Sequence, residues 1–510
     1  MRPLGWFWTV VLVLPPLLAL LVLPSFGQRM VTLVGIYALM GVGYQLVFGQ
    51  LGALNLAQGA LFGLGAYALA LLAPAAGLLA LPLAAIVAAA TAALVCGPLL
   101  RLQSHYFALA TLALAALVNL VAVHVADLTG GANGLAGFTA ALPTGAALLS
   151  LVWACLIVAV VLYARLFRGS LGHQARLLRE APLAAATLGI DGGRWRFAAF
   201  VAGAALAGLA GGFSATLSGV VSPDVTSFPI MILCLTSVVL GGSRHPMGAV
   251  LGAVIAVCLP EMLRDLQGLW LLAYAAATLV VVRWAPEGLA GLIDRWRGAT
   301  AAATPLPMLP DSLALSGGPR ELVLESVSKS FGGVAALSDV SFTVDRGEVV
   351  GLIGPNGSGK TTLLNVIGGL ESADGGTIRL DGQRIDGLSP HRIARAGIGR
   401  TFQTVPLADE TRRGDIVRAI TSGAPFLLLD EPAAGASDRE RRDIARLVDQ
   451  VSAAGRGVLI VDHDIDLLTR VCDRLVCLDR GRVIAAGRPA EVRADPRVRA
   501  TFLGLDEAAA

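Results

Sequence analysis

The sequence predicts two domains of different fold class: a polytopic α-helical membrane domain, followed by a smaller α/β domain that carries a P-loop. Of the 510 residues, 55% are hydrophobic and 15% are charged, whereas an ordinary soluble domain has roughly 25% charged residues. Apolar runs long enough to cross a bilayer recur before about residue 300. Beyond that point, short strand-like segments alternate with helical patterns, which is typical of a mainly parallel sheet.

The membrane domain is expected over residues 1–300, with about ten spans. A hydrocarbon layer roughly 30 Å thick requires about 20 apolar residues in a helix. The first run lacks a clear small-residue cleavage site and another run follows at once, so we expect a membrane helix and not a signal peptide. The predicted spans lie near residues 5–25, 30–49, 55–74, 76–100, 106–127, 142–166, 195–219, 226–242, 246–263 and 268–284.

The arginines predict the orientation of these spans. If the N-terminus is cytoplasmic, ten of the twelve arginines before residue 284 lie on the inner side, and only Arg29 and Arg264 lie outside, as the positive-inside rule requires. The residues after 284 are then cytoplasmic. Almost no ionisable group falls deep in a span, which argues against a proton- or sodium-coupled carrier.

The longest predicted cytoplasmic loop runs from Leu166 to about Trp195. Arg176, Arg179 and Glu180, followed by the alanines 184–186, predict a short helix that lies against a partner. A solvated arginine-rich loop is the alternative. The net charge of +3 gives no indication of a nucleic-acid partner, and the six scattered cysteines form no C-x-x-C pair that would indicate zinc.

The strongest motif is GLIGPNGSGKTTLLNVIGGL at residues 351–370, which contains the P-loop pattern Gly354-x-x-x-x-Gly359-Lys360-Thr361. An apolar strand is predicted before it at 349–353, and a helical pattern follows. Glycines let backbone N–H groups turn toward phosphate oxygens, and the helix N-terminus adds its dipole. We expect Lys360 to reach the β- and γ-phosphates of ATP and Thr361 to bind Mg²⁺.

Two further segments fit phosphate chemistry. FLLLDEP at 426–432 predicts an apolar strand ending in Asp430 and Glu431, a Mg²⁺ ligand followed by a residue that polarises the attacking water. His463 follows the next apolar strand in VLIVDHD, where it is a candidate γ-phosphate contact. The proline-rich segment 301–320 is expected to be a linker, which leaves 321–510 as the nucleotide-binding domain.

Taken in this order, these parts resemble the branched-chain amino-acid ABC importer family, with the permease fused to the ATP-binding subunit. The resemblance covers nearly the whole chain. In the membrane half it rests on YQLVFGQLGALNLAQGALFGLGAYA (44–68), HYFALATLAL (105–114), LTGGANGLAG (128–137), REAPLAAATLGI (179–190), LAGLAGGFSA (206–215), VVLGGSRHPMGAVLGA (238–253) and RWAPEGLAGL (283–292). In the ATPase half it rests on ARAGIGRTFQ (394–403), DEPAAGAS (430–437) and AAGRPAEVRADPRVRATFLG (485–504).

The resemblance implies roles for individual residues. Phe331 would stack on adenine, Gln403 would sense the γ-phosphate and Mg²⁺, Glu431 would be the general base and His463 the switch histidine. Thr361, Gln403 and Asp430 would hold Mg²⁺, and the segment 171–190 would carry a coupling helix that docks on an ATPase subunit. The ATP phosphates would be held by Gly354, Pro355, Asn356, Gly357, Ser358, Gly359, Lys360, Thr361 and Thr362.

The resemblance also implies an assembly in the inner membrane of a bacterial cell. Its other parts would be a second permease subunit, a second ATPase subunit and a periplasmic substrate-binding protein. The family carries leucine, isoleucine, valine and related amino acids, together with amide or urea relatives.

One expected part of the ATPase fold is missing from the sequence. Only 26 residues separate Gln403 from Asp430, whereas the family places a helical subdomain there with an L-S-G-G-Q-like signature. We find no such signature and expect this subdomain to be largely absent between 404 and 425, by a deletion between about Leu407 and Arg418. ATP hydrolysis is then expected only with an intact partner ATPase that supplies the signature.

Two alternatives remain open at this point. The ATPase half is either a working partner in hydrolysis or a non-hydrolysing, regulatory or degenerate nucleotide-binding module fused to a permease. An ABC exporter is disfavoured because its membrane half usually has six spans, and the order and motifs here are importer-like.

Overall fold

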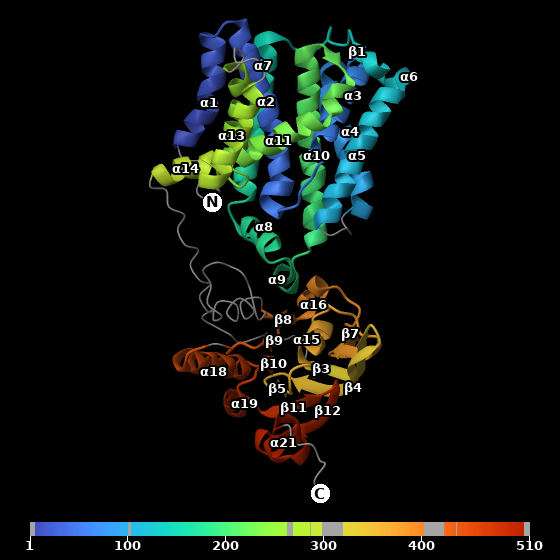
Figure 1. Cartoon of the computed structure of the whole chain (residues 1–510), viewed down its shortest axis with the longest axis vertical. Helices are drawn as coiled ribbons and strands as arrows, with labels where there is room; N and C mark the ends of the chain where they lie inside the picture. Colours follow the sequence, from blue (N-terminus) through green and yellow to red (C-terminus); the bar gives the residue numbers. More distant parts are fainter. Residues whose placement is uncertain are drawn as a thin grey trace. The chain divides into compact units, whose positions relative to one another are not determined.

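The computed structural model describes residues 6–99, 104–262, 269–285, 287–297, 320–401, 423–434 and 436–503. The chain forms two compact units, one comprising Met1–Arg179 and Gly193–Ala302 and the other Glu180–Gly192 and Ala303–Ala510. The first unit is helical, and its long helices run alongside one another (Figure 1). The second unit is an α/β fold that also includes a short piece of chain from between two membrane helices.

Ten helices of the first unit lie where the sequence predicts apolar spans. Five segments are long and apolar enough to cross a membrane among the described residues, and α1, α11 and α12 are shorter apolar helices. The bounds are α1 Trp6–Leu21, α2 Ser25–Tyr44, α3 Gln58–Ala76, α4 Ala80–Leu99, α5 Ser104–His124, α7 Gly145–Leu166, α10 Gly192–Ser218, α11 Phe228–Gly241, α12 Gly248–Met262 and α13 Leu269–Trp284. The short elements are α6 Ala126–Thr129, strands β1 Leu135–Ala136 and β2 Val220–Val221, which pair with each other, and α14 Gly288–Trp296.

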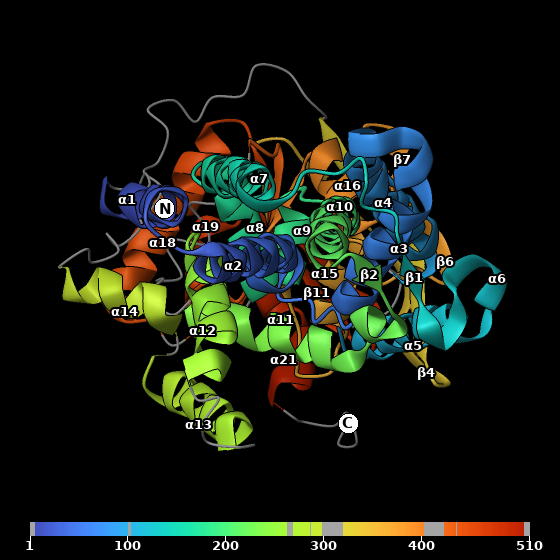
Figure 2. The ribbon, with the colours of Figure 1, turned by 90° about the horizontal axis from the view of Figure 1, so that it is seen from above.

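Helix α2 lies at the centre of the first unit, and α7, α10, α11 and α12 surround it when the unit is seen from above (Figure 2). Small residues let the helices approach closely. A Cβ atom on Gly211 of α10 would stand 1.8 Å from the carbonyl oxygen of Phe62 on α3, and one on Gly65 of α3 would stand 2.1 Å from that of Gly208. Backbone packs directly on backbone at these positions, as small residues allow in membrane helices.

The segment between α7 and α10 differs from the prediction of one short helix. It forms two helices, α8 Ser170–Glu180 and α9 Pro182–Thr187. They are separated at Ala181, whose backbone leaves the helical conformation at φ −144° and ψ 73°. The cause is Pro182, because a proline disfavours the helical conformation of the residue before it.

Two sheets organise the second unit. A six-stranded sheet has the order β12-β11-β5-β10-β9-β8, with five parallel strands and β12 antiparallel at one edge. A four-stranded antiparallel sheet has the order β4-β3-β6-β7. The strands are β3 Glu321–Phe331, β4 Val334–Asp345, β5 Val349–Ile353, β6 Gly375–Leu380, β7 Gln383–Arg384, β8 Ile398–Arg400, β9 Phe426–Asp430, β10 Gly457–Val461, β11 Arg474–Asp479 and β12 Arg482–Gly487.

Both faces of the parallel sheet are buried. Along β5, Val350 and Leu352 belong to one apolar core with helix α15, whereas Val349 and Ile353 belong to a second core with α18 and α19. Such two-sided burial gives the continuous apolar runs that identified these strands in the sequence. The helices of this unit are α15 Lys360–Ile367, α16 Pro390–Ala396, α18 Asp438–Ala453, α19 Ile465–Val471, α20 Pro489–Ala494 and α21 Pro496–Leu503.

Two predicted features fall largely outside the described residues. The linker at 301–320 is described only at Arg320. Gln403 and the shortened segment from 404 to 422 are not described, and the chain resumes with a turn at 423–425 that leads into β9.

Candidate functional site

The P-loop joins the end of β5 to the start of α15. Its glycines adopt backbone angles that other residues rarely take: φ is +81° at Gly357 and +104° at Gly359. A Cβ atom on Gly359 would stand 2.5 Å from the carbonyl oxygen of Ala336. The loop therefore needs glycine both for its turn and for its close contact with β4.

Lys360 lies inside this loop. Its Nζ donates hydrogen bonds of 2.8 Å to the carbonyl oxygens of Gly354 and Pro355. Burial lowers the pKa of the Lys360 ammonium, while the negative charges of Glu431 and Asp430 oppose that shift. An ammonium in the first turn of a helix that follows a glycine-rich loop is suited to bind the phosphates of ATP.

Ser358 and Thr361 extend the same site. The Ser358 hydroxyl is buried and makes no hydrogen bond to the described residues. It is therefore available to form a hydrogen bond with a polar ligand in the loop. Thr361, in the first turn of α15, is exposed. Among the remaining predicted phosphate contacts, Asn356 is exposed in the loop and Thr362 is half-buried in α15.

Asp430 ends β9, which is separated from the P-loop strand β5 by β10. Its partner is Arg400 at the end of β8. Arg400 Nη2 lies 3.3 Å from Asp430 Oδ2 and donates a 2.8 Å hydrogen bond to Asn365 Oδ1. The two charged side chains are only 2% and 5% exposed. Burial raises the pKa of Asp430, and the Arg400 charge counteracts this rise.

Glu431 and His463 meet although 32 positions separate them. Parallel pairing of β9 with β10 brings the two strand ends together, with Asp430 opposite Val461. His463 Nε2 then lies 2.9 Å from Glu431 Oε1. Glu431 has φ +47°, a left-handed conformation that is uncommon for a residue with a Cβ atom and is concentrated at functional sites.

Phe331 lies at the end of β3 and is 44% exposed. Lys329 Nζ stands 5.3 Å from the centre of its ring, within cation–π range. Lys329 is itself held by Asp374 at 3.0 Å. The ring is therefore supported from its own strand while its surface stays open for stacking.

The structure brings Asp430, Glu431 and Lys360 into one electrostatic neighbourhood. Gln403, the remaining predicted γ-phosphate contact, lies outside the described residues. Sequence analysis missed Arg400, which lies in a three-residue strand too short to show a period. The available signal was its position in ARAGIGRTFQ, because a lone arginine ending an apolar strand needs a counter-ion when it is buried.

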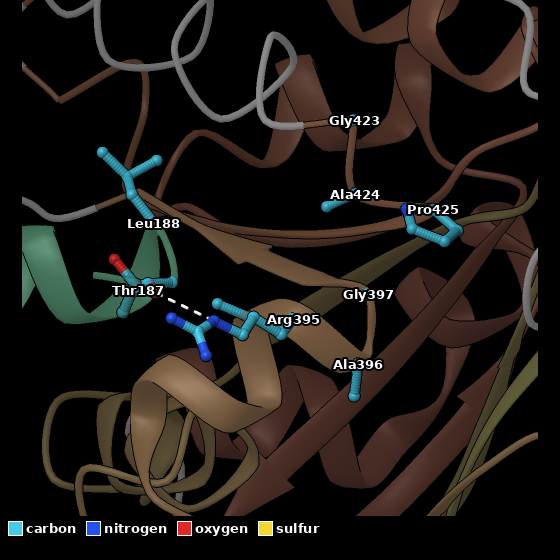
Figure 3. Close-up of a pocket in the computed structure, with 10 residues that line it drawn as sticks. Thr187, Leu188, Arg395, Ala396, Gly397, Gly423, Ala424 and Pro425 are labelled. Atoms are coloured by element: carbon cyan, nitrogen blue, oxygen red, sulfur yellow. Dashed lines mark hydrogen bonds between the residues drawn. The ribbon is translucent and has the colours of Figure 1, made fainter. Parts of the chain in front are cut away.

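A second candidate site is formed by the predicted coupling segment, because residues 180–192 pack within the ATPase unit. Helix α9 contacts α16 and β8. Arg395 Nε donates to the carbonyl oxygen of Gly189 at 3.2 Å, and His391 Nε2 lies 3.5 Å from Asp191 Oδ2. Figure 3 shows Arg395 extending toward the chain at Thr187 and Leu188.

A cavity of about 360 Å³ opens beside this contact. It is lined by the end of the coupling segment, the end of α16 and the turn before β9. Its lining residues are Thr187, Leu188, Gly189, Ala394, Arg395, Ala396, Gly397, Gly423, Ala424 and Pro425 (Figure 3). The predicted coupling segment thus lies against β8, the edge strand of the six-stranded sheet.

Comparison with known families defines the class of protein. Residues 28–282 match the family described as branched-chain amino acid transport system / permease component, and residues 337–413 match the ABC transporter family. Residues 482–508 match the family described as branched-chain amino acid ATP-binding cassette transporter. The chain therefore combines a membrane permease domain with an ABC ATPase domain, which implies ATP binding. Because the first match spans half of the 510 residues, the chain belongs to the branched-chain amino acid transport permease family.

Individual relatives resemble the ATPase half. The lipopolysaccharide export system ATP-binding protein LptB of Escherichia coli K12 is 32% identical over 235 residues, covering 36% of this chain and 98% of the relative. The high-affinity branched-chain amino acid transport ATP-binding protein BraF of Pseudomonas aeruginosa is 30% identical over 248 residues, covering 36% and 97%. A crystal structure of a nucleotide-free ATP-binding cassette from an ABC transporter is 27% identical, with a TM-score of 0.34, covering 36% and 98%.

Proposed function

We propose that this chain is one permease and one ATPase half of an ATP-driven importer for branched-chain or related amino acids. The observation that carries the proposal is that two separate parts of the chain, 28–282 and 482–508, match families described for branched-chain amino acid transport. The ATPase half alone does not decide the direction, because it resembles an export ATPase and a branched-chain amino acid ATPase about equally. The membrane half therefore favours import.

In the proposed reaction the P-loop holds the phosphates of ATP. Residues 354–362 supply backbone N–H groups and the Lys360 ammonium, and Thr361, Gln403 and Asp430 are the proposed Mg²⁺ ligands. Bound Mg²⁺ would neutralise phosphate charge. Glu431 orients and deprotonates the attacking water, and its contact with His463 fixes the carboxylate. Phe331 stacks on the adenine.

We further propose that the ATPase half lacks most of the helical subdomain. The aligned region with LptB has 235 positions but uses 36% of this chain, about 184 of 510 residues. The difference of about 51 positions supports a shortened ATPase half. An ATPase of this kind closes ATP between the P-loop of one subunit and the signature of another, so this chain needs an intact partner ATPase.

The complete importer would then contain this chain, a second permease subunit, that intact ATPase and a periplasmic substrate-binding protein. The proposed location is the bacterial inner membrane, with the ATPase half in the cytoplasm. The substrate is a small amino acid delivered by the binding protein.

The test is leucine uptake into vesicles that contain this chain and its partner subunits, with and without Glu431→Gln. Uptake that depends on ATP and is lost in the variant supports hydrolysis at this chain's own P-loop. Unchanged uptake in the variant means that the partner subunit hydrolyses ATP alone. Absence of uptake by the parent chain, restored when a complete helical subdomain is grafted between residues 403 and 426, supports the alternative of a non-hydrolysing module.

A further inference from the structure

The cytoplasmic end of helix α2 is irregular. After Tyr44 the helix continues as a π-helical turn from Gln45 to Gly49, and the chain then leaves the helix at Gly52, where φ is +68°. π-helical turns are rare and concentrate at functional sites. Because α2 is the central helix of the membrane unit, a change at this end reaches several neighbouring helices.

Arg179 of α8 holds this end. Its Nη1 donates a 3.3 Å hydrogen bond to the carbonyl oxygen of Phe48 and a shorter one to that of Gly49. These carbonyls belong to the last turn of the helix, which carries partial negative charge. The Phe48 carbonyl also accepts a 3.1 Å hydrogen bond from the Gly52 N–H, so Arg179 adds a second donor there. Its aliphatic stem packs where a side chain on Gly52 would be, since a Cβ atom there would stand 3.0 Å from Arg179 Cγ.

The same turn is bound to two other parts of the membrane unit. The Gln45 side-chain amide donates to the carbonyl oxygens of Gly242 and His245, at 3.0 and 3.1 Å, in the connection between α11 and α12. The Gln50 amide donates to the hydroxyl of Tyr163 on α7. A displacement of the turn therefore acts on α7 and on the α11–α12 connection together.

Arg179 is also the last residue of the membrane unit before the chain enters the ATPase unit, because Glu180 begins the segment that packs with α16 and β8. Arg179 therefore directly precedes the docking segment, which we define as residues 180–192, with no flexible linker between them. A displacement of the docking segment is transmitted along the chain to Arg179 of helix α8, which binds the end of α2.

We propose that Arg179 is the positioning residue that transmits nucleotide-driven movement of the docking segment to the π-helical turn of α2. The inference rests on the proposed ATP-driven function, and it adds the residue and the helix end through which the membrane domain responds. A guanidinium suits this role because it binds two carbonyls at once with a fixed geometry.

The experiment is hydrogen–deuterium exchange of the full chain in lipid nanodiscs, with and without ATP and Mg²⁺. The peptide covering 351–370 reports nucleotide binding, the peptide covering 41–57 reports the α2 turn, and the peptide covering 28–40 reports whether α2 is folded. In the parent chain we expect ATP to slow exchange in 351–370 and to change exchange in 41–57 by about tenfold or more, the range of a charge-assisted hydrogen bond.

In Arg179→Gln we expect the response at 41–57 to vanish while the response at 351–370 and the protection of 28–40 persist. Arg179→Lys should keep part of the response, and Arg176→Gln, on the same helix, should keep all of it.

A response at 41–57 in Arg179→Gln equal to that of the parent would overturn the proposal, as would a parent chain in which 351–370 responds and 41–57 does not. No response at 351–370 in the parent would refute ATP binding itself, and with it the proposed function. A variant that loses protection across 28–40 would give Arg179 a purely structural role and also overturn the proposal.

Discussion

Removal of Arg400 is expected to destabilise the ATPase unit strongly. The Arg400→Ala substitution leaves the carboxylate of Asp430 buried without its counter-ion and removes the 2.8 Å hydrogen bond to Asn365. Breaking one side of a buried ion pair costs about 3–5 kcal/mol. Since the two side chains are only 2% and 5% exposed, solvent compensates little of this cost.

The loss should depend on pH in a defined direction. Burial already raises the pKa of Asp430 above its ordinary value, and Arg400 opposes the rise. Without Arg400 the pKa rises further, so the folded variant binds a proton that the unfolded chain has released. Stability of the variant relative to the parent therefore falls as pH increases through the folded-state pKa and recovers as pH decreases toward the unfolded value.

Hydrogen–deuterium exchange is the suitable assay because all seven tryptophans lie at or before residue 296, so tryptophan fluorescence reports only the membrane half. At neutral pH we expect the amides of β9 and β10 to exchange roughly a hundredfold to a few thousandfold faster in Arg400→Ala, which corresponds to the stated cost. The matched control is Arg379→Ala, whose ion pair with Glu325 is 41% and 58% exposed and should contribute less than about 1 kcal/mol. An increase below tenfold for Arg400→Ala, or an equal increase for Arg379→Ala, would refute the argument from burial.

Two further predictions concern the other regions. Gly211→Ala should disrupt helix packing in the membrane unit, because its Cβ would stand 1.8 Å from a backbone carbonyl. Gly97→Ala should be tolerated, because no atom of a neighbouring element in the described part of the chain lies within 4 Å of its Cβ. Thermal unfolding followed by tryptophan fluorescence distinguishes the two variants, and equal melting temperatures would contradict the packing. Phe331→Ala should weaken binding of a fluorescent ATP analogue about fivefold to a hundredfold, since stacking of a base on an aromatic ring contributes about 1–3 kcal/mol. The neighbouring Val334→Ala, at a position 72% exposed, should leave affinity unchanged, and an equal loss in both variants would exclude stacking.

Much of the fold could be predicted from the sequence because its signals are long or strongly spaced. The apolar run predicted at 142–166 appears as α7 at 145–166, and the strand predicted at 349–353 is β5 with the same bounds. The P-loop was predictable because its glycines, lysine and threonine have fixed spacing around one backbone conformation. Length, period and spacing are all properties that a single sequence carries.

The remaining features depend on contacts between distant residues. Arg179 and Gly49 are 130 positions apart, and a sequence gives the charge of an arginine but not the carbonyl that it binds. Arg400 was missed for the same reason, since its strand has three residues and no measurable period. The division of the loop into α8 and α9 had a local signal in Pro182, and our prediction of one helix was wrong because it ignored the effect of proline on the preceding residue.

The two halves of the chain are stabilised in different solvents, and this decides which substitutions each tolerates. In lipid there is no hydrophobic gain from bringing helices together, so packing relies on close backbone approach, as at Gly211 against Phe62. In water the ATPase sheet gains from burying apolar strands such as β5 on both faces. A glycine-to-alanine change at a helix contact such as Gly211 therefore damages the membrane unit, because the added volume separates the helices. A truncation such as Leu352→Ala damages the sheet instead, because it leaves a cavity and costs about 2–5 kcal/mol. Arg179 connects the two halves. Its guanidinium donates a hydrogen bond to a carbonyl at a helix end of the membrane unit, and the next residue, Glu180, begins the segment that packs within the ATPase unit.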